Sequence, residues 1–300
     1  MFKLSNNETI KTAYFGSSDF SVMVLEELKK KEFLPDILVS TPDTASGRGL
    51  KITPSAIKDF GVSNDIIVLQ PSNLKGVEER LKEIDLFLVA SYGKIIPKKI
   101  LDLPKFGTLN IHPSLLPKYR GASPLQSAIL NGDAQTGVSI MLVDEKMDHG
   151  PVFVQEKIQL ENWNPSFLEL REKSAKIGAR LLLETINKMI VANLMPEEQD
   201  HSKASFTEKI DKKEGFIESE VLLFPKQDLE QAIIAERKIR ALNPNPGTFS
   251  FFKTREKEIR VKITKAKADQ DKILIVEKVV PEGKKEMSWA DFLRGTKIHV

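Results

Sequence analysis

The fold class is decided by residues 11–40, KTAYFGSSDFSVMVLEELKKKEFLPDILVS. Residues 11–17 predict a short buried strand. Residues 19–31 carry apolar side chains at helical spacing, with Asp19 as the expected N-cap and lysines in the last turn, where positive charge suits the helix dipole. Residues 36–40 predict the next strand. Apolar strands separated by a helix predict a parallel sheet covered by helices on both faces.

The same alternation continues to about residue 190. Further strands are expected at residues 65–70, 85–93, 107–111, 136–143 and 151–160. Further helices are expected at residues 55–61, 77–84 and 166–190. We therefore expect an α/β, Rossmann-like, doubly wound domain over residues 1–193. No G-x-G-x-x-G follows the first strand and no Walker A loop is present, so this pattern gives no support for NAD or ATP.

The last third of the chain has a different pattern. Residues 194–206 are polar and broken, and we expect a linker there. Residues 207–300 combine one expected helix, at 226–242, with alternating strand-like runs such as EIRVKITKAKA at 258–268. Short alternating strands with a helix at their entrance predict a C-terminal small β-barrel domain, OB-like in type.

Composition excludes several classes of protein. No apolar run approaches the roughly 20 residues of a membrane helix, and the N-terminus lacks the apolar core of a signal peptide. We therefore expect a cytoplasmic protein with no membrane partner. We also expect a monomer. The absence of cysteine excludes disulfides, a thiol nucleophile and thiolate metal ligands. Since H-E-x-x-H is also absent, we expect no metal.

Charge is unevenly distributed along the chain. Residues 201–300 carry 21 Lys and Arg against 16 Asp and Glu, whereas residues 1–200 carry 24 against 26. A basic C-terminal domain is typical of a polyanionic partner. The alternative is a solvated strand surface, which charge alone favours.

The residues best suited to chemistry lie around NIHPSLLPKYRG, residues 110–121. Asn110 and His112 are two apart at the C-terminal end of an expected strand, so their side chains point to the same side. Ligands bind at this end of strands in open α/β sheets. Asp148, in the turn DEKMDHGP at 144–151, can reach the same edge. An Asn, a His and an Asp suit acyl transfer without a covalent enzyme intermediate, because the carboxylate orients the imidazole and two donors stabilise an oxyanion.

A structural alternative exists for His112. An isolated histidine at a strand end is more often bonded to backbone than catalytic. Pro113 and Pro117 make the following loop rigid, which favours a functional site. The residues alone leave both interpretations open.

Residues 110–151 resemble the signature of the folate-dependent formyltransferases, an N-x-H-x-S-L-L-P loop followed by D-x-G-P. The resemblance implies that Asn110, His112 and Asp148 are catalytic and that 10-formyltetrahydrofolate is the co-substrate. It also implies a folate site. Its residues would be Ala90, Ser91, Tyr92 and Gly93, against the pterin edge, and Ser114, Leu115, Leu116 and Pro117.

Three further stretches, at 15–20, 41–58 and 89–101, resemble those members of the family that formylate methionyl-tRNA. This resemblance implies initiator methionyl-tRNA as the partner. The residues expected to contact it are Arg48, Lys51, Lys253, Arg255 and Lys262. Two rival functions stay open, an amino-sugar nucleotide N-formyltransferase and a non-catalytic tRNA-binding module. The Gly-Arg-Gly triplet at 47–49 favours the tRNA enzyme over the first, and intact Asn110, His112 and Asp148 oppose the second.

Overall fold

The computed structural model describes residues 2–46, 51–53, 55–161, 163–254, 257–269 and 273–296. The chain divides there into two compact units, each described below by itself. The first unit contains residues 1–121, 136–158 and 171–206. The second contains residues 122–135, 159–170 and 207–300. The domain boundaries expected from the sequence stay predictions.

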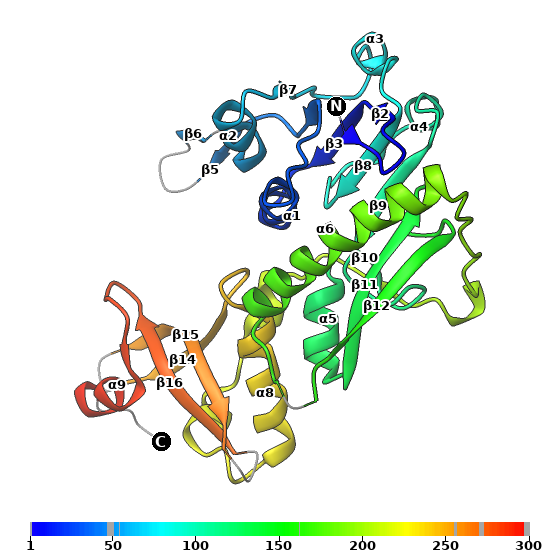
Figure 1. The fold of residues 1–300 in the computed structure, drawn as a ribbon. Coiled ribbons are helices and arrows are strands. Elements are labelled where there is room, and N and C mark those ends of the chain that lie inside the picture. The colour runs from blue at the N-terminus through cyan, green and yellow to red at the C-terminus, as the bar shows by residue number, and fades with distance from the viewer. Residues whose placement is uncertain are drawn as a thin grey trace. The chain divides into compact units, whose positions relative to one another are not determined.

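The first unit is built on a sheet that has seven strands among the described residues (Figure 1). Their order is β12 (Val152–Gln159), β11 (Gln135–Leu142), β9 (Thr108–His112), β8 (Leu86–Ala90), β3 (Thr12–Gly16), β4 (Ile37–Val39) and β7 (Ile67–Leu69). The five strands from β9 to β7 are parallel, which confirms the expected α/β core. Two short hairpins, β1 (Phe2–Lys3) with β2 (Thr9–Ile10) and β5 (Thr44–Ser46) with β6 (Lys51–Thr53), lie outside it.

Strand β11 departs from the parallel pattern. It runs antiparallel to β9, with Ser139 opposite His112 and Leu142 opposite Leu109. The chain therefore re-enters the sheet at the edge where β9 ends, and the connection between them does not cross the sheet. The expectation that residues 136–143 continue the parallel sheet is wrong, because an apolar run carries no information on strand direction.

Helices cover both faces of this sheet. On one face, Tyr14 of β3 donates its hydroxyl hydrogen to a backbone carbonyl of α1 (Asp19–Lys29), and Leu38 of β4 lies against α2 (Ala56–Ser63). The long helix α6 (Phe167–Val191) crosses β9 on the same face, as Figure 1 shows. The opposite face packs an apolar cluster that includes Phe15 and Phe87, beneath the short helices α3 (Glu78–Leu81) and α4 (Lys98–Leu101).

The N-terminus of α1 differs in detail from the sequence expectation. The N-cap is Ser18, whose hydroxyl accepts from the Ser21 amide in a capping box, and Asp19 is the first helical residue. Serine and aspartate are nearly equal as N-caps, so sequence could not choose between neighbours. Asp19 still places a negative charge in the first turn, where the helix dipole favours it.

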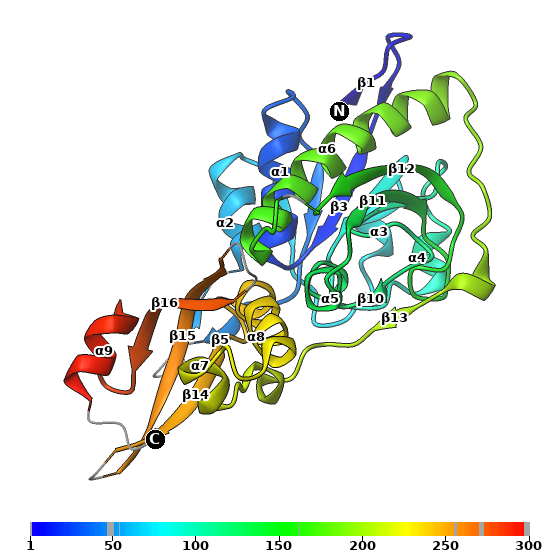
Figure 2. The same cartoon turned by 90° about the horizontal axis from the view of Figure 1, so that it is seen from below.

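The second unit is an antiparallel sheet packed by helices. Its strands are β14 (Thr248–Lys253), β15 (Glu258–Ala268), β16 (Leu274–Pro281) and β17 (Met287–Ser288). Its helices are α5 (Pro124–Asn131), α7 (Ser219–Leu223), α8 (Leu229–Leu242) and α9 (Trp289–Gly295). Helix α8 lies against β15, and α5 lies beside α8 (Figure 2). The apolar core here includes Phe252, Ile263 and Phe292. Among the described helices of the chain, none is long and apolar enough to span a membrane.

Candidate active site

Two side chains of β9 meet one carboxylate. Asn110 and His112 project from the same face of the strand, and both approach Asp148 from the turn between β11 and β12. Asn110 Nδ2 lies 3.4 Å from Asp148 Oδ1. His112 Nδ1 lies 3.5 Å from the same oxygen. The strand period therefore places Asn110 and His112 as expected, and the turn carries Asp148 to them.

The His112 ring lies between two acceptors. Its Nε2 is 2.9 Å from the carbonyl oxygen of Tyr119, opposite the Asp148 carboxylate. The residue is 4 % exposed, so bulk water does not satisfy either ring nitrogen. An imidazole that carries both hydrogens can donate to both oxygens, whereas a neutral ring leaves one acceptor without a hydrogen. The ring is therefore held between the Tyr119 carbonyl and the Asp148 carboxylate.

Backbone geometry fixes both of these acceptors. Asp148 Oδ2 accepts from the Gly121 amide at 2.7 Å, which ties the turn to the loop after β9. Asp148 and Tyr119 both have left-handed backbones, with φ of 51° and 61°. Non-glycine residues rarely adopt this conformation, and it persists where surrounding contacts enforce it. Backbone strain at Tyr119 and Asp148, whose oxygens face the His112 ring, is typical of a functional site.

The segment expected to be a linker belongs to this site. Residues 197–206 run along the loop and the turn, and Glu197 pairs with Val152 through backbone hydrogen bonds in both directions. Gln199 donates to the carbonyl oxygens of Asp148 and Gly150. Ser205 accepts from the Tyr119 amide through its hydroxyl and from the Arg120 amide through its carbonyl. No local pattern in the sequence marks Gln199 or Ser205, because these hydrogen-bond partners are at least 49 residues away.

Two basic residues of the loop after β9, Lys118 and Arg120, have different surroundings. Arg120 is 3 % exposed and donates to Gln199 Oε1 at 2.7 Å and to His201 Nδ1 at 2.8 Å. A guanidinium enclosed in this way is structural. Lys118 is exposed, with its ammonium 4.6 Å from the centre of the Tyr119 ring.

Two other histidines lie beside the turn. The ring of His149 stacks on that of His201 with 4.1 Å between their centres. His149 Nδ1 is 2.6 Å from Asp144 Oδ2, within the same turn. His149 therefore braces the turn and makes no contact with the carboxylate of Asp148 among the described interactions.

The segments expected to hold folate lie at the same edge as Asn110. Val89 of β8 is opposite Asn110 in the parallel pair, so residues 90–93 follow at the neighbouring strand end. Ser91 and Gly93 are exposed there. Tyr92 is different, since its ring packs against Phe15 and burial raises the pKa of its hydroxyl to about 12. Only the backbone of Tyr92 can face a ligand.

The Ser114–Pro117 segment is held mainly by its own protein partners. Ser139 donates to the Ser114 carbonyl and accepts from the Leu116 amide. Gln155 donates to the Leu116 carbonyl at 2.8 Å. Leu115 and Pro117 are half-buried. These contacts make the segment a rigid apolar wall, which suits one face of a flat ring system. The polar edge of the ring would then be bound by residues 90–93.

The expected tRNA-contacting residues are only partly described. Arg48 and Arg255 lie outside the described residues, and Lys51 begins β6. Lys253 and Lys262 are exposed on the outer face of the β14–β15 pair, where Lys262 is opposite Phe249.

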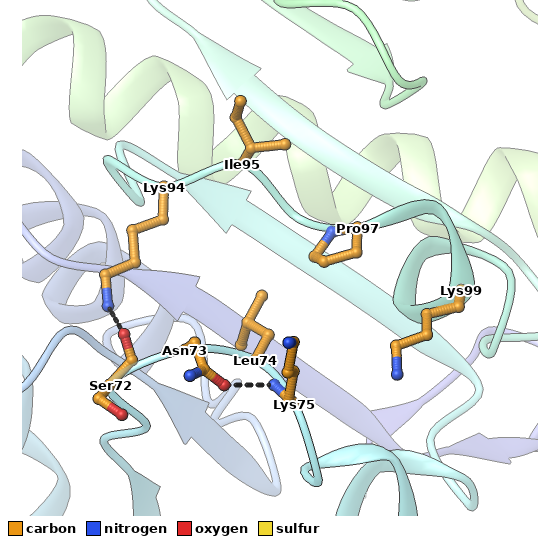
Figure 3. A pocket seen from close by; sticks show the side chains of 8 residues that line it. All are labelled: Ser72, Asn73, Leu74, Lys75, Lys94, Ile95, Pro97 and Lys99. Atoms are coloured by element: carbon orange, nitrogen blue, oxygen red, sulfur yellow. Dashed lines mark hydrogen bonds between the residues drawn. The ribbon is translucent and has the colours of Figure 1, made fainter.

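A separate hollow of about 340 Å³ lies on the first unit, between residues 72–75 and 94–99 (Figure 3). Lys94 donates to the Ser72 carbonyl at its rim. Asn110, His112 and Asp148 are not among its lining residues. No group of three or more His, Asp or Glu side chains is placed to hold a metal ion in the part of the chain that the structure describes.

Comparison with known proteins gives consistent matches. The family model described as formyl transferase matches residues 10–186. A methionyl-tRNA formyltransferase of Dictyoglomus thermophilum is 36% identical, over 97% of this chain and 98% of its own. Among solved structures, a methionyl-tRNA formyltransferase from Clostridium thermocellum has a TM-score of 0.60 at 19% identity, covering 91% of this chain and 99% of that one. An N-formyltransferase from Helicobacter canadensis, in complex with folinic acid and dTDP-3-aminofucose, has a TM-score of 0.58 at 22% identity, covering 87% and 88%.

Proposed function

The chain belongs to the methionyl-tRNA formyltransferase family, and on this premise we propose that it transfers the formyl group of 10-formyltetrahydrofolate to the α-amino group of methionyl-initiator tRNA. The product, formyl-methionyl-tRNA, serves translation initiation, and we place the enzyme in the cytoplasm as a monomer. The observation that carries the proposal is the convergence of Asn110 and His112 on Asp148 Oδ1.

The bound co-substrate supplies the formyl carbon that the methionyl amine attacks. Asn110 has two amide hydrogens, and the contact with Asp148 uses one, so the other can donate to the developing oxyanion. The His112 Nδ1 to Asp148 distance of 3.5 Å is longer than an ordinary N–H···O bond, so this hydrogen can be shared with the oxyanion. Asp148 keeps the ring oriented and, through water, takes the proton that the amine loses. The bond between the formyl carbon and N10 of the folate then breaks, and the proton is passed to N10, so that tetrahydrofolate leaves.

The tRNA is proposed to bind through phosphate contacts. Lys253 and Lys262 lie on one face of the second unit, and Arg48, Lys51 and Arg255 are proposed to join them on the basis of the family resemblance. Protein–phosphate contacts release counterions, so binding must weaken as salt rises.

One assay tests the substrate. The protein is incubated with 10-formyltetrahydrofolate and either methionyl-initiator tRNA or an amino-sugar nucleotide, and formyl transfer is followed. We expect product with the tRNA alone. Transfer to the sugar amine alone would identify an amino-sugar N-formyltransferase, the activity class of the Helicobacter canadensis structure. No transfer to either, with tRNA binding retained, would identify a binding module.

A further inference from the structure

Both acceptors of His112 are held by one short segment of chain, residues 199–205. Ser205 binds the Tyr119 and Arg120 amides, so it fixes the Tyr119 carbonyl that accepts from His112 Nε2. Gln199 binds the turn that carries Asp148, which faces His112 Nδ1. The geometry of the catalytic ring thus depends on a segment that contributes no group to the reaction.

Gln199 uses both ends of its side-chain amide. Its amide nitrogen donates to the carbonyls of Asp148, at 3.0 Å, and Gly150, at 2.6 Å. Its amide oxygen accepts from the Arg120 guanidinium through Nε and a terminal nitrogen, at 3.2 and 2.7 Å. An amide offers two donors and one acceptor with two lone pairs, so all of its capacity is used. The residue is 8 % exposed, so water does not replace a lost partner.

The turn needs this support. Asp148 has a left-handed backbone, a conformation that is unfavourable in a non-glycine residue and must be maintained by its surroundings. Gly150 approaches the Leu142 carbonyl so closely that a Cβ would lie 2.0 Å from its oxygen. Gln199 bridges the carbonyls of these two residues, and its removal leaves the Asp148 side chain held by the Gly121 amide.

We propose that Gln199 is a positioning residue for formyl transfer, holding Asp148 in register with Asn110 and His112 through its two carbonyl contacts. This rests on the proposed function, because it assigns the catalytic roles to those three residues. A misplacement of about 1 Å at a reacting centre can cost about 100-fold in rate. The effect should fall on kcat, since Gln199 does not contact the substrates' expected binding segments.

The test uses two substitutions of Gln199 in the full-length enzyme. Gln199→Ala removes every contact. Gln199→Glu keeps the acceptor for Arg120 and adds a charge partner, but it presents oxygen to the two carbonyls. We expect both to lower kcat about 10- to 100-fold with KM for tRNA and folate changed less than about threefold. Glu198→Ala, at an exposed neighbouring position, is the matched control and should leave both constants unchanged. Wild-type kcat in Gln199→Glu would overturn the proposal, because only the Arg120 contact would then matter.

A double-mutant cycle separates positioning from general damage. In an Asp148→Asn background, Gln199→Ala should lower kcat by less than about threefold, because the group that Gln199 positions is already lost. Full additivity would overturn the proposal.

A measurement without substrate separates this proposal from the proposed function. The chain has four histidines, so the ring ¹⁵N signals are few, and His112→Ala assigns the relevant one. The His112 signal should move in both Gln199 variants and stay in place in Glu198→Ala. An unmoved His112 signal overturns the positioning role. Absence of tRNA formylation by the wild-type enzyme would instead contradict the proposed function.

Discussion

At the scale of single residues, the site depends on two side-chain nitrogens that converge on one carboxylate oxygen. Asn110 and His112 both lie within 3.5 Å of Asp148 Oδ1, on the strand end that neighbours residues 90–93. Loss of one oxyanion donor typically costs about 100- to 1,000-fold in kcat. We therefore expect Asn110→Ala and His112→Ala to lose that much turnover while tRNA affinity, measured by filter binding, stays within about threefold. Asn73→Ala, an exposed loop substitution, is the control. Near-wild-type turnover in both variants would remove them from the mechanism.

A second residue-scale feature is Asp43, which precedes β5 and binds residues that follow β6. Its carboxylate accepts from the Lys58 ammonium, the Gln70 amide and the Ser55 backbone. These hydrogen bonds, with Lys58 the largest contribution, lower the pKa of Asp43 below its ordinary value of 3.8. A lowered pKa stabilises the fold while the group is ionised. This contribution is present above pH 3.8 and is lost as pH falls through the lower pKa of the folded state.

The test compares wild type with Asp43→Asn in unfolding titrations across pH. We expect wild type to be more stable near neutral pH and the difference to close below pH 3.8. Lys58→Met should move that closing to higher pH, because it removes the main cause of the shift. A stability difference that does not change with pH would show that the charge of Asp43 is not involved.

The candidate site shows what sequence can predict at this scale and what it cannot. Asn110 and His112 follow from a strand period of two. Asp148 is predicted only from its place in a turn between two expected strands. Its contacts with Asn110 and His112 are known only from the structure. Gln199 lies in a polar stretch with no periodicity, where composition predicts a linker. Its function arises from packing between segments far apart in sequence, which leaves no local signal.

At the scale of secondary structure elements, the position of β9 depends on α6. Gly178 of α6 lies over β9, and a Cβ there would be 2.5 Å from Ile111 Cγ2. Ile111 is 1 % exposed and β-branched, so this methyl group cannot turn away without a change of rotamer. The close approach fixes the strand that carries Asn110 and His112.

Gly178→Ala tests this packing. Alanine in a helix interior gains about 0.5–1 kcal/mol over glycine, but overpacking of a core costs about 1–3 kcal/mol. We expect the clash to dominate, with a net loss of free energy of unfolding in urea and a fall in kcat. Gly295→Ala, at a helical glycine with nothing within 4 Å of the added Cβ, is the matched control and should be neutral or stabilising. If Gly178→Ala stabilises the protein, α6 can shift away from β9 without loss of stability, and the close approach does not fix the strand.

Sequence patterns predicted the elements better than their arrangement. The parallel β3, β4 and β8 were expected from apolar runs between helices, and α6 from its long amphipathic period. The antiparallel direction of β11 was missed, because direction depends on where the connection leaves and re-enters the sheet. The grouping of α5 with α8 in the second unit is likewise a tertiary contact that no local pattern encodes.

At the scale of the whole molecule, the chain is expected to divide two kinds of recognition between its units. Folate recognition is proposed for strand ends of the first unit, where contacts are apolar walls and backbone edges. Much of the tRNA contact is proposed for charged side chains of the second unit. The binding of the two substrates should therefore depend differently on salt concentration, because counterion release accompanies phosphate contacts and not apolar packing.

We expect the KM for methionyl-tRNA to rise steeply with salt while the KM for 10-formyltetrahydrofolate changes little. Each single-strand or duplex phosphate contact contributes about 0.7–0.9 to the slope of log affinity against log salt. Lys253 and Lys262 are exposed on one face, so a Lys253→Ala, Lys262→Ala double variant should reduce that slope by about 1.4–1.8 if each binds one phosphate. Lys82→Ala, at an exposed lysine of the first unit paired with Glu79, is the control and should leave it unchanged. An unaltered slope in the double variant would assign those lysines to solvation, the interpretation that charge alone favoured.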